Sequence, residues 1–338
     1  MDLDSLSVLL IWTAIAIYAA AFVAYVFDLA RRSQVATDAR YGEQAAPTLV
    51  GAAVGAVGSG APARQDASAS VAGAGAGAGA GTKPRFVMAR IGMSLTVLGF
   101  LFHLGGEVLR GVAAGRVPWS NMYEFAMTGT LLIIAVYIAV NVRLDLKYLG
   151  TFILGLVVVL LGGAATNFYV VVVPLADPLK SVWLVIHVFV ATLGTAFFAL
   201  AFSLSVLQLL QHRRERFVVA GAEKKGLRFL TTLPSSVRLE SLAYRFATVG
   251  FILWTFTLIA GSIWAQDAWG RYWGFDTKET WTFIIWVLYA GYIHARATRG
   301  WRGTRSAWLS IVGFAAVLFN FTIVNLFFKG LHVYSGLS

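Results

Sequence analysis

The sequence predicts an all-α protein, a polytopic membrane helix bundle of about eight transmembrane helices with a tryptophan-rich outer loop. Of the 338 residues, 58% are hydrophobic and only 13% are charged, too little polar surface to enclose a soluble core of this size. The apolar residues gather in runs of roughly 20, the length that a helix needs to cross a bilayer. Eight such runs occur, at 6–27, 86–108, 125–142, 148–165, 183–210, 246–263, 280–294 and 307–328, of which 280–294 is the shortest.

The runs divide the chain into three parts. The first apolar run follows an acidic start and has no basic flank or small-residue cleavage site, so residues 1–30 are expected to be a retained transmembrane helix and not a signal peptide. Residues 31–85 are rich in Ala and Gly and are expected to be a disordered cytoplasmic linker. Residues 86–338 are expected to be one membrane domain.

The net charge of +11 follows from the orientation of the helices. All but six of the 27 Lys and Arg residues fall on alternate connections; the exceptions are Arg110, Arg116, Lys180, Arg271, Lys278 and Lys329. The positive-inside rule places the basic connections in the cytoplasm, with both termini and the Trp-rich loop outside. We therefore expect a multi-pass protein of a bacterial plasma membrane, although a thylakoid protein would have a similar composition. No nucleic-acid partner is required, and the absence of Cys excludes thiol chemistry within the chain.

The Trp-rich segment 264–281 holds four of the eleven Trp residues. Indoles prefer the membrane interface, and this explains such a belt in general terms. It does not explain Asp276, Lys278 and Glu279, which stand among the rings. The combination favours a large, flat and partly charged ligand at this loop.

A second outer connection, 116–124, carries Asn121 and Glu124 at the start of an apolar run. Two interpretations remain open for them. Ser120 or Asn121 can cap the helix, or the same polar residues can support a functional site.

Two histidines flank the Trp-rich loop at similar height. His187 lies within the first turns of the run at 183–210, and His332 follows the last run. A lone His in a membrane helix is more often a hydrogen-bonded packing residue than a ligand, and this interpretation stays open for both. Intramembrane ionisable groups are nevertheless scarce and tend to be functional, and two of them flanking an aromatic loop favour the ligand interpretation. Neutral imidazole prefers iron, copper or zinc, and without Cys a haem iron held between two imidazoles fits the available ligands.

The remaining histidines have other interpretations. His294 lies at the inner end of the seventh run, where it is either an interfacial residue or a ligand at an inner site. His103, near Glu107, is expected to be a packing residue, and His212 is expected to be solvated.

The Trp-rich segment resembles the tryptophan-rich WWD motif of the CcsA/ResC family of cytochrome c biogenesis proteins. The matching residues are Trp269, Gly270, Trp273, Asp276, Lys278 and Glu279, whereas Phe275 replaces the usual Trp and Thr277 a common Pro. The segments 118–124, 183–188, 292–296 and 325–332 resemble other motifs of that family.

The resemblance implies a membrane protein that binds haem b transiently and without a covalent bond. Haem would enter near His294 and reach the outer loop, where His187 and His332 would be axial ligands to its iron. Trp269, Trp273 and Asp276 would bind the cofactor, with Asn121, Glu124, Lys278 and Glu279 as supporting residues. The protein would act with a CcsB/ResB-like partner and thiol-reducing proteins, as a subunit of a cytochrome c synthase, and present haem to the Cys-x-x-Cys-His segment of apocytochrome c.

Two alternatives compete with this function. The first is a related protein that loads haem onto a chaperone, as CcmC does. The second, from another class, is a secondary transporter, although broken helices and inverted halves are not visible in the sequence.

Overall fold

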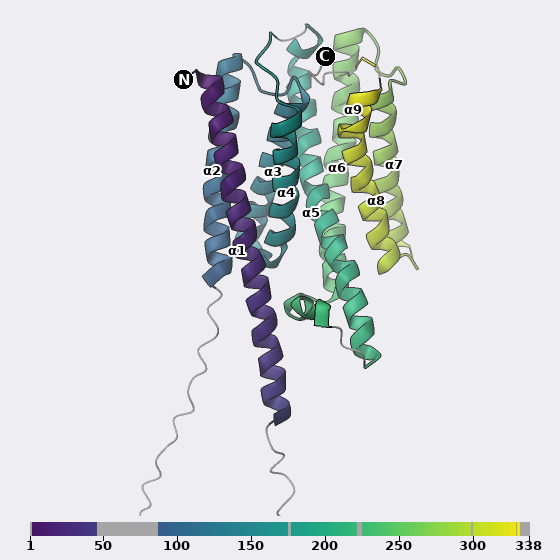
Figure 1. Ribbon diagram of the computed structural model, residues 1–338. Coiled ribbons are helices and arrows are strands. Elements are labelled where there is room, and N and C mark those ends of the chain that lie inside the picture. Colours follow the sequence, from purple (N-terminus) through teal and green to yellow (C-terminus); the bar gives the residue numbers. More distant parts are fainter. Residues whose placement is uncertain are drawn as a thin grey trace, which may run out of the picture.

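The computed structural model describes residues 2–45, 87–174, 177–221, 225–298, 300–328 and 330–331, and every regular element within them is helical. This confirms the predicted all-α class, and Figure 1 shows the long helices running side by side. The elements are α1 (Leu3–Ala45), α2 (Val87–Ala114), α3 (Met122–Arg143), η1 (Lys147–Leu149), α4 (Gly150–Asn167), η2 (Asp177–Lys180), α5 (Val182–Val219), η3 (Lys225–Thr232), α6 (Ser236–Trp269), α7 (Thr277–Ala297), α8 (Thr304–Phe321) and α9 (Ile323–Phe327).

Seven helices among the described residues are long and apolar enough to cross a membrane, which confirms a multi-pass membrane protein. The eighth long helix, α7, has 21 residues but is not among the seven. Lys278 and Glu279 lie in its first turn and Arg296 in its last turn, and these charges lower the mean hydropathy of the helix. The same helix corresponds to the weakest apolar run of the sequence.

Two boundaries differ from the prediction. Helix α1 continues to Ala45, so the chain from 31 to 45 is helical rather than linker, because that stretch contains no Pro or Gly before Gly42. The rest of the predicted linker, 46–85, lies outside the described residues. Helix α6 likewise continues to Trp269, so the first third of the predicted loop 264–281 is helical.

Small residues let α1 pack closely on α2. Gly92, Gly99 and Gly106 recur every seven residues on α2 and face Tyr25, Tyr18 and Ile11, which recur every seven residues on α1. A Cβ atom at Gly99 would lie 2.7 Å from the ring of Tyr18. This heptad of large residues against small ones is the geometry of tightly packed membrane helices.

A stacked aromatic pair joins α5 to α7 in the core. The rings of Phe198 and Tyr289 lie 3.6 Å apart with an interplanar angle of 6°. Gly250 on α6 lies against Phe198, and Gly313 on α8 lies against Tyr289. Four helices thus meet at one pair of rings, and this packing fixes the position of α5 in the bundle.

The end of the bundle that carries the α6–α7 connection is called the loop end below. The first residues of α1, α3, α5 and α7 also lie there, at the top of Figure 1. The basic residues Arg143, Arg214 and Arg296 belong to the opposite end of their helices. This separation agrees with the predicted charge asymmetry, while the side of the membrane that each end faces stays a prediction.

Candidate functional site

The α6–α7 connection at the loop end is a short loop, 270–276. Helix α6 stops at Trp269 because Gly270 adopts the left-handed conformation, with φ of 71°. Helix α7 begins after Asp276, which is its N-cap and forms a capping box with Glu279. Only Trp273 of the four tryptophans therefore lies in the loop itself.

Glu279 holds the loop from below. Its carboxylate accepts hydrogen bonds from the backbone N–H of Gly274 at 2.8 Å and of Asp276 at 3.1 Å, and the guanidinium of Arg271 lies 3.8 Å away. The side chain is buried, with 8% exposed. These contacts order the loop through one carboxylate oxygen, while the buried Oε1 of Glu279 has no hydrogen-bond partner.

Phe275 at the loop tip has a strained backbone. Its φ is 56°, the one positive value at a non-glycine position among the described residues. Its ring is 82% exposed, while Trp273 is 37% exposed and Tyr272 is 62% exposed. Strain of this kind costs about 1–3 kcal/mol and tends to occur at functional sites.

His187 on α5 lies beneath the loop in a defined orientation. Its Nδ1 lies 2.9 Å from the carbonyl oxygen of Thr257, and its ring stacks on Trp264 with centroids 5.8 Å apart at 22°. Because a carbonyl oxygen only accepts, Nδ1 carries the proton and Nε2 has the lone pair in the neutral ring. Proteins orient a metal-binding histidine in the same way, with a hydrogen bond from the ring N–H that does not face the metal.

Gly261 makes room for the His187 ring. A Cβ atom at position 261 would lie 2.7 Å from Cε1 and 2.8 Å from Nδ1 of His187. Glycine at this position therefore permits both the hydrogen bond to Thr257 and the stacking on Trp264.

Two cavities meet at His187. The larger has a volume of about 370 Å³ and is lined by α3, α4, α5, α6, α7 and α8; the smaller, about 120 Å³, lies between α5, α6 and α7. The smaller one includes Tyr272 and Trp273 of the loop. The residues common to both are Phe125, His187, Trp254, Lys278 and Asn320.

Trp269 has a different position from the one that the motif implies. It packs on Trp264, with ring centroids 4.8 Å apart, in a small core with Leu179, Leu184 and Val188. It lines neither cavity. The larger cavity is instead lined by Trp264, which stacks on His187.

The polar end of the larger cavity presents two amide side chains, each with one polar atom that has no hydrogen-bond partner. The Oδ1 of Asn121 accepts from the N–H of Glu124, and the Nδ2 of Asn320 donates to Thr282, so both amide orientations are fixed. The Nδ2 of Asn121 and the Oδ1 of Asn320 have no partner, although the residues are only 5% and 6% exposed. Buried polar atoms in this state indicate a place for a ligand or for water.

Lys278 adds a hydrogen-bond donor to the same wall. Its Nζ donates to the Oδ1 of Asn325, and the Nδ2 of Asn325 donates in turn to the carbonyl of Phe321. Among the described residues no carboxylate forms an ion pair with Lys278. The structure thus brings His187 and Lys278 together at one wall.

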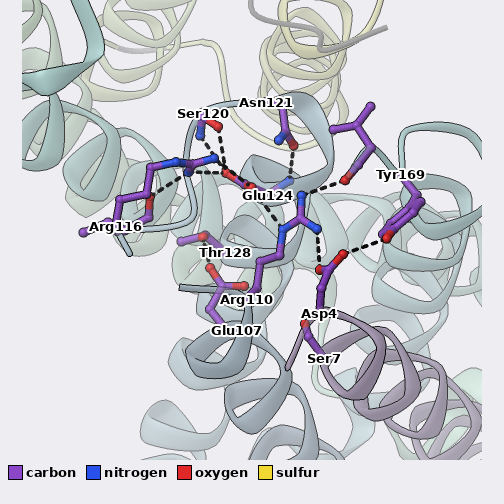
Figure 2. Close-up of polar contacts among 12 residues, drawn as sticks. Asp4, Ser7, Glu107, Arg110, Arg116, Ser120, Asn121, Glu124, Thr128 and Tyr169 are labelled. Atoms are coloured by element: carbon purple, nitrogen blue, oxygen red, sulfur yellow. Dashed lines mark hydrogen bonds and ion pairs between the residues drawn. The ribbon is translucent and has the colours of Figure 1, made fainter. Parts of the chain in front are cut away.

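Asn121 and Glu124 belong to a buried ion network, which Figure 2 shows. Asn121 is the N-cap of α3, which supports the capping interpretation. The Glu124 carboxylate accepts from Arg110 at 3.1 Å, from Arg116 at 2.8 Å and from the backbone N–H of Ser120 at 2.9 Å. These contacts occupy the carboxylate, so Glu124 positions the start of α3.

The network also holds α1. Arg110, which is fully buried, donates to Asp4 at 2.6 Å and to the carbonyl of Val170 at 2.7 Å, and Tyr169 donates to Asp4 at 2.8 Å. Burial and the hydrogen bond to Asp4 raise the pKa of Tyr169 above its ordinary value. The first turn of α1 is therefore tied to the connections at the loop end (Figure 2).

Three further histidines stood out in the sequence, and the structure describes two of them, His294 and His103. His332 lies outside the described residues, but the N–H of Leu331, which precedes it, donates to Asp276 at 3.2 Å. His294 is exposed near the last turn of α7, about 24 Å along the helix from Lys278. His103 is fully buried and edge-on to Tyr18, in line with the packing role expected for it.

Sequence reasoning missed Thr257, Gly261 and Asn320. Thr257 acts through its backbone, and Gly261 acts through the absence of a side chain, so neither carries a signal in one sequence. Asn320 did carry one, because an amide within the apolar run 307–328 is costly unless it has a partner or a purpose.

Comparison with known proteins decides the family. Residues 119–332 match the family model described as cytochrome C assembly protein. Cytochrome c biogenesis protein CcsA of Guillardia theta is 33% identical over 255 residues, which cover 68% of this chain and 80% of that protein.

The chain belongs to the CcsA family of cytochrome c biogenesis proteins. CcsA of Synechococcus sp. (strain RCC307) is 32% identical over 274 residues, 75% of this chain and 87% of that protein. CcsA of Heterosigma akashiwo (strain NIES-293 / 8280G21-1) is 31% identical over 249 residues, 65% and 77% respectively. A role in cytochrome c assembly follows for this chain. The family model covers the loop, His187 and the larger cavity but starts after α1 and α2.

Proposed function

We propose that this protein binds haem b, delivers it to the outer face of the membrane and presents it there for attachment to apocytochrome c. The observation that carries the proposal is the setting of His187. Its Nδ1 is held by the Thr257 carbonyl, its ring stacks on Trp264, and it lies where two cavities meet below the Trp-rich loop. An oriented neutral imidazole beside an apolar cavity fits a haem ligand.

Further residues have distinct parts in the proposal. His332 would be the second ligand to the haem iron, and the neighbouring Leu331 donates a hydrogen bond to Asp276 of the loop, which supports this proposal. Trp273 and Tyr272 line the smaller cavity and offer rings to a flat ligand. Asp276 and Glu279 shape the loop, and His294 is the ligand of an inner site at the opposite end of α7.

The chemistry is the addition of two cysteine thiols of the substrate across the two vinyl groups of haem. Each S–H bond breaks, a C–S bond forms at one vinyl carbon and a proton reaches the other, so no oxidant or reductant is consumed. The residues of this chain hold the haem in place and limit access of water to it. A CcsB/ResB-like partner and thiol-reducing proteins complete the system in this proposal, which makes the chain a subunit of a synthase.

Family membership favours this function over a secondary transporter. A chaperone-loading protein would share the haem site and differ in the protein that receives the haem. Transfer of haem to an apocytochrome c peptide with a Cys-x-x-Cys-His segment, rather than to a chaperone, distinguishes the two.

The test is the haem content of the purified full-length protein, from its reduced absorption spectrum and a pyridine haemochrome assay. The His187→Gly variant is expected to lose haem and to regain it with added imidazole, which replaces the missing ring. His212→Gly is the matched control, because His212 lies on the same helix about 37 Å away. Full haem retention in His187→Gly, with an unchanged spectrum, refutes the proposal.

A further inference from the structure

The larger cavity extends from the loop end into the membrane-spanning part of the bundle. Its lining on α3 runs from Asn121 to Ile133, about 18 Å along the helix. On α8 and α9 it runs from Phe314 to Asn325. The amide and lysine side chains lie at the loop end, and the remainder is formed by apolar side chains together with Thr130 and Thr195. A volume of about 370 Å³ is within the range of ligand sites, roughly 300–1,000 Å³.

The cavity reaches the flank of the bundle. Val159 and Gly163 of α4 line it, and Val159 is 71% exposed. Both residues belong to a helix long and apolar enough to cross a membrane. A cavity that reaches the surface there faces the hydrocarbon of the bilayer, so a ligand that enters at this point must be soluble in lipid.

The polar end matches a carboxyl group. Lys278 and the Nδ2 of Asn121 are donors for its oxygens, and the unpartnered Oδ1 of Asn320 accepts from its O–H. One acceptor among donors suits a protonated carboxyl group, the form in which an acid dissolves in a membrane. The predicted ligand is thus an apolar molecule with a carboxyl group at one edge.

Such a ligand would arrive beside the candidate haem ligand. His187, Lys278 and Asn320 line both cavities. The distant His294, in contrast, lines neither of them. The larger cavity therefore connects His187 to the side of the bundle, and neither cavity connects it to His294 at the far end of α7.

We propose that this lateral cavity, between α4 and α8, is the entry through which haem dissolved in the bilayer reaches His187. The inference rests on the proposed function, and it adds the route and the group that is recognised. Haem has the required chemistry, since it is flat, apolar over most of its surface and has two carboxyl groups at one edge.

The chain offers matched variants that fill the cavity without a clash. A Cβ atom at Gly163 or at Gly162 would meet no atom within 4 Å, but only Gly163 lines the cavity. Gly163→Phe should place its ring in the cavity, and Gly162→Phe makes the same change on the neighbouring position. Gly129→Leu fills the cavity independently from α3, where a Cβ also meets open space.

The experiment measures haem uptake by the haem-free full-length protein in lipid nanodiscs, from phosphatidylcholine vesicles loaded with haemin. The rate is followed by the growth of the Soret band. Gly163→Phe and Gly129→Leu are expected to take up haem about tenfold more slowly or worse, because a side chain that already fills the cavity must be displaced. Gly162→Phe should match the unmodified protein, and all variants should reach the same final spectrum, since His187 is unchanged.

The outcomes separate this inference from the proposed function. Uptake by Gly163→Phe and Gly129→Leu at the unmodified rate overturns the lateral route and leaves the haem site intact. No uptake by the unmodified protein overturns both. Co-purified phospholipid or fatty acid that is lost in Gly163→Phe, with an unchanged rate of haem uptake, shows that the cavity holds a lipid and also overturns the route.

Discussion

Replacing Gly261 with alanine adds one methyl group where the His187 ring has least room. The new Cβ would lie 2.7 Å from Cε1 and 2.8 Å from Nδ1 of His187, well inside van der Waals contact. The ring cannot move away without losing contacts, because the carbonyl of Thr257 lies 2.9 Å from Nδ1 and Trp264 covers one face. We expect the ring to swing and to lose the hydrogen bond.

The magnitude follows from three terms. Alanine in place of glycine stabilises a helix by about 0.5–1 kcal/mol. Overpacking costs about 1–3 kcal/mol, and the lost hydrogen bond costs about 0.5–1.5 kcal/mol. The free energy of unfolding should therefore fall by about 0.5–4 kcal/mol. Loss of the group that orients a metal-binding histidine should lower haem affinity about 10–100-fold.

The assay is a haem titration of Gly261→Ala with thermal unfolding of the same sample. Gly162→Ala is the control, because a Cβ there meets no atom within 4 Å and the variant reports the helix term alone. Gly261→Ala should bind haem weakly, whereas Gly162→Ala should bind it as the unmodified protein does. Equal haem affinity and equal stability in the two variants would refute the placement of His187 against Gly261.

Three more perturbations test other parts of the structure by thermal unfolding. Glu124→Gln removes the anion between the buried Arg110 and the partly buried Arg116 and should lower the free energy of unfolding by about 3 kcal/mol. Gly99→Leu should lower it by about 1–3 kcal/mol, because the side chain meets Tyr18. Phe275→Gly should raise it by about 1 kcal/mol, because glycine adopts a positive φ without strain. An unchanged midpoint contradicts the first two, and a lower midpoint contradicts the third.

The helices were predictable because each depends on its own residues. Eight apolar runs predicted eight long helices, and the weakest run became α7, whose charged ends exclude it from the apolar spans. The ends of the helices were less predictable, since a helix does not stop where the apolar run stops. Helix α6 ends at Trp269, six residues beyond the run, because Gly270 adopts a left-handed backbone conformation.

The motif residues were predictable, but their tasks were not. Asp276, Lys278 and Glu279 stood out as charges among aromatic rings. The structure gives them different contacts: Glu279 supports the loop, Asp276 holds the backbone of Leu331, and Lys278 borders both cavities. One segment of sequence does not show which way each side chain points.

The sequence by itself determined the class, the number of long helices and the candidate ligand His187, because hydropathy and residue type act locally. Only the tertiary structure decided the surroundings of His187. The carbonyl of Thr257 and the empty space at Gly261 lie 70 and more residues further along the chain. The cavity lies between α4, which packs mainly on α1 and α3, and α8, which packs on α5. Space of this kind depends on how several helices are arranged, and no single residue of the sequence encodes it.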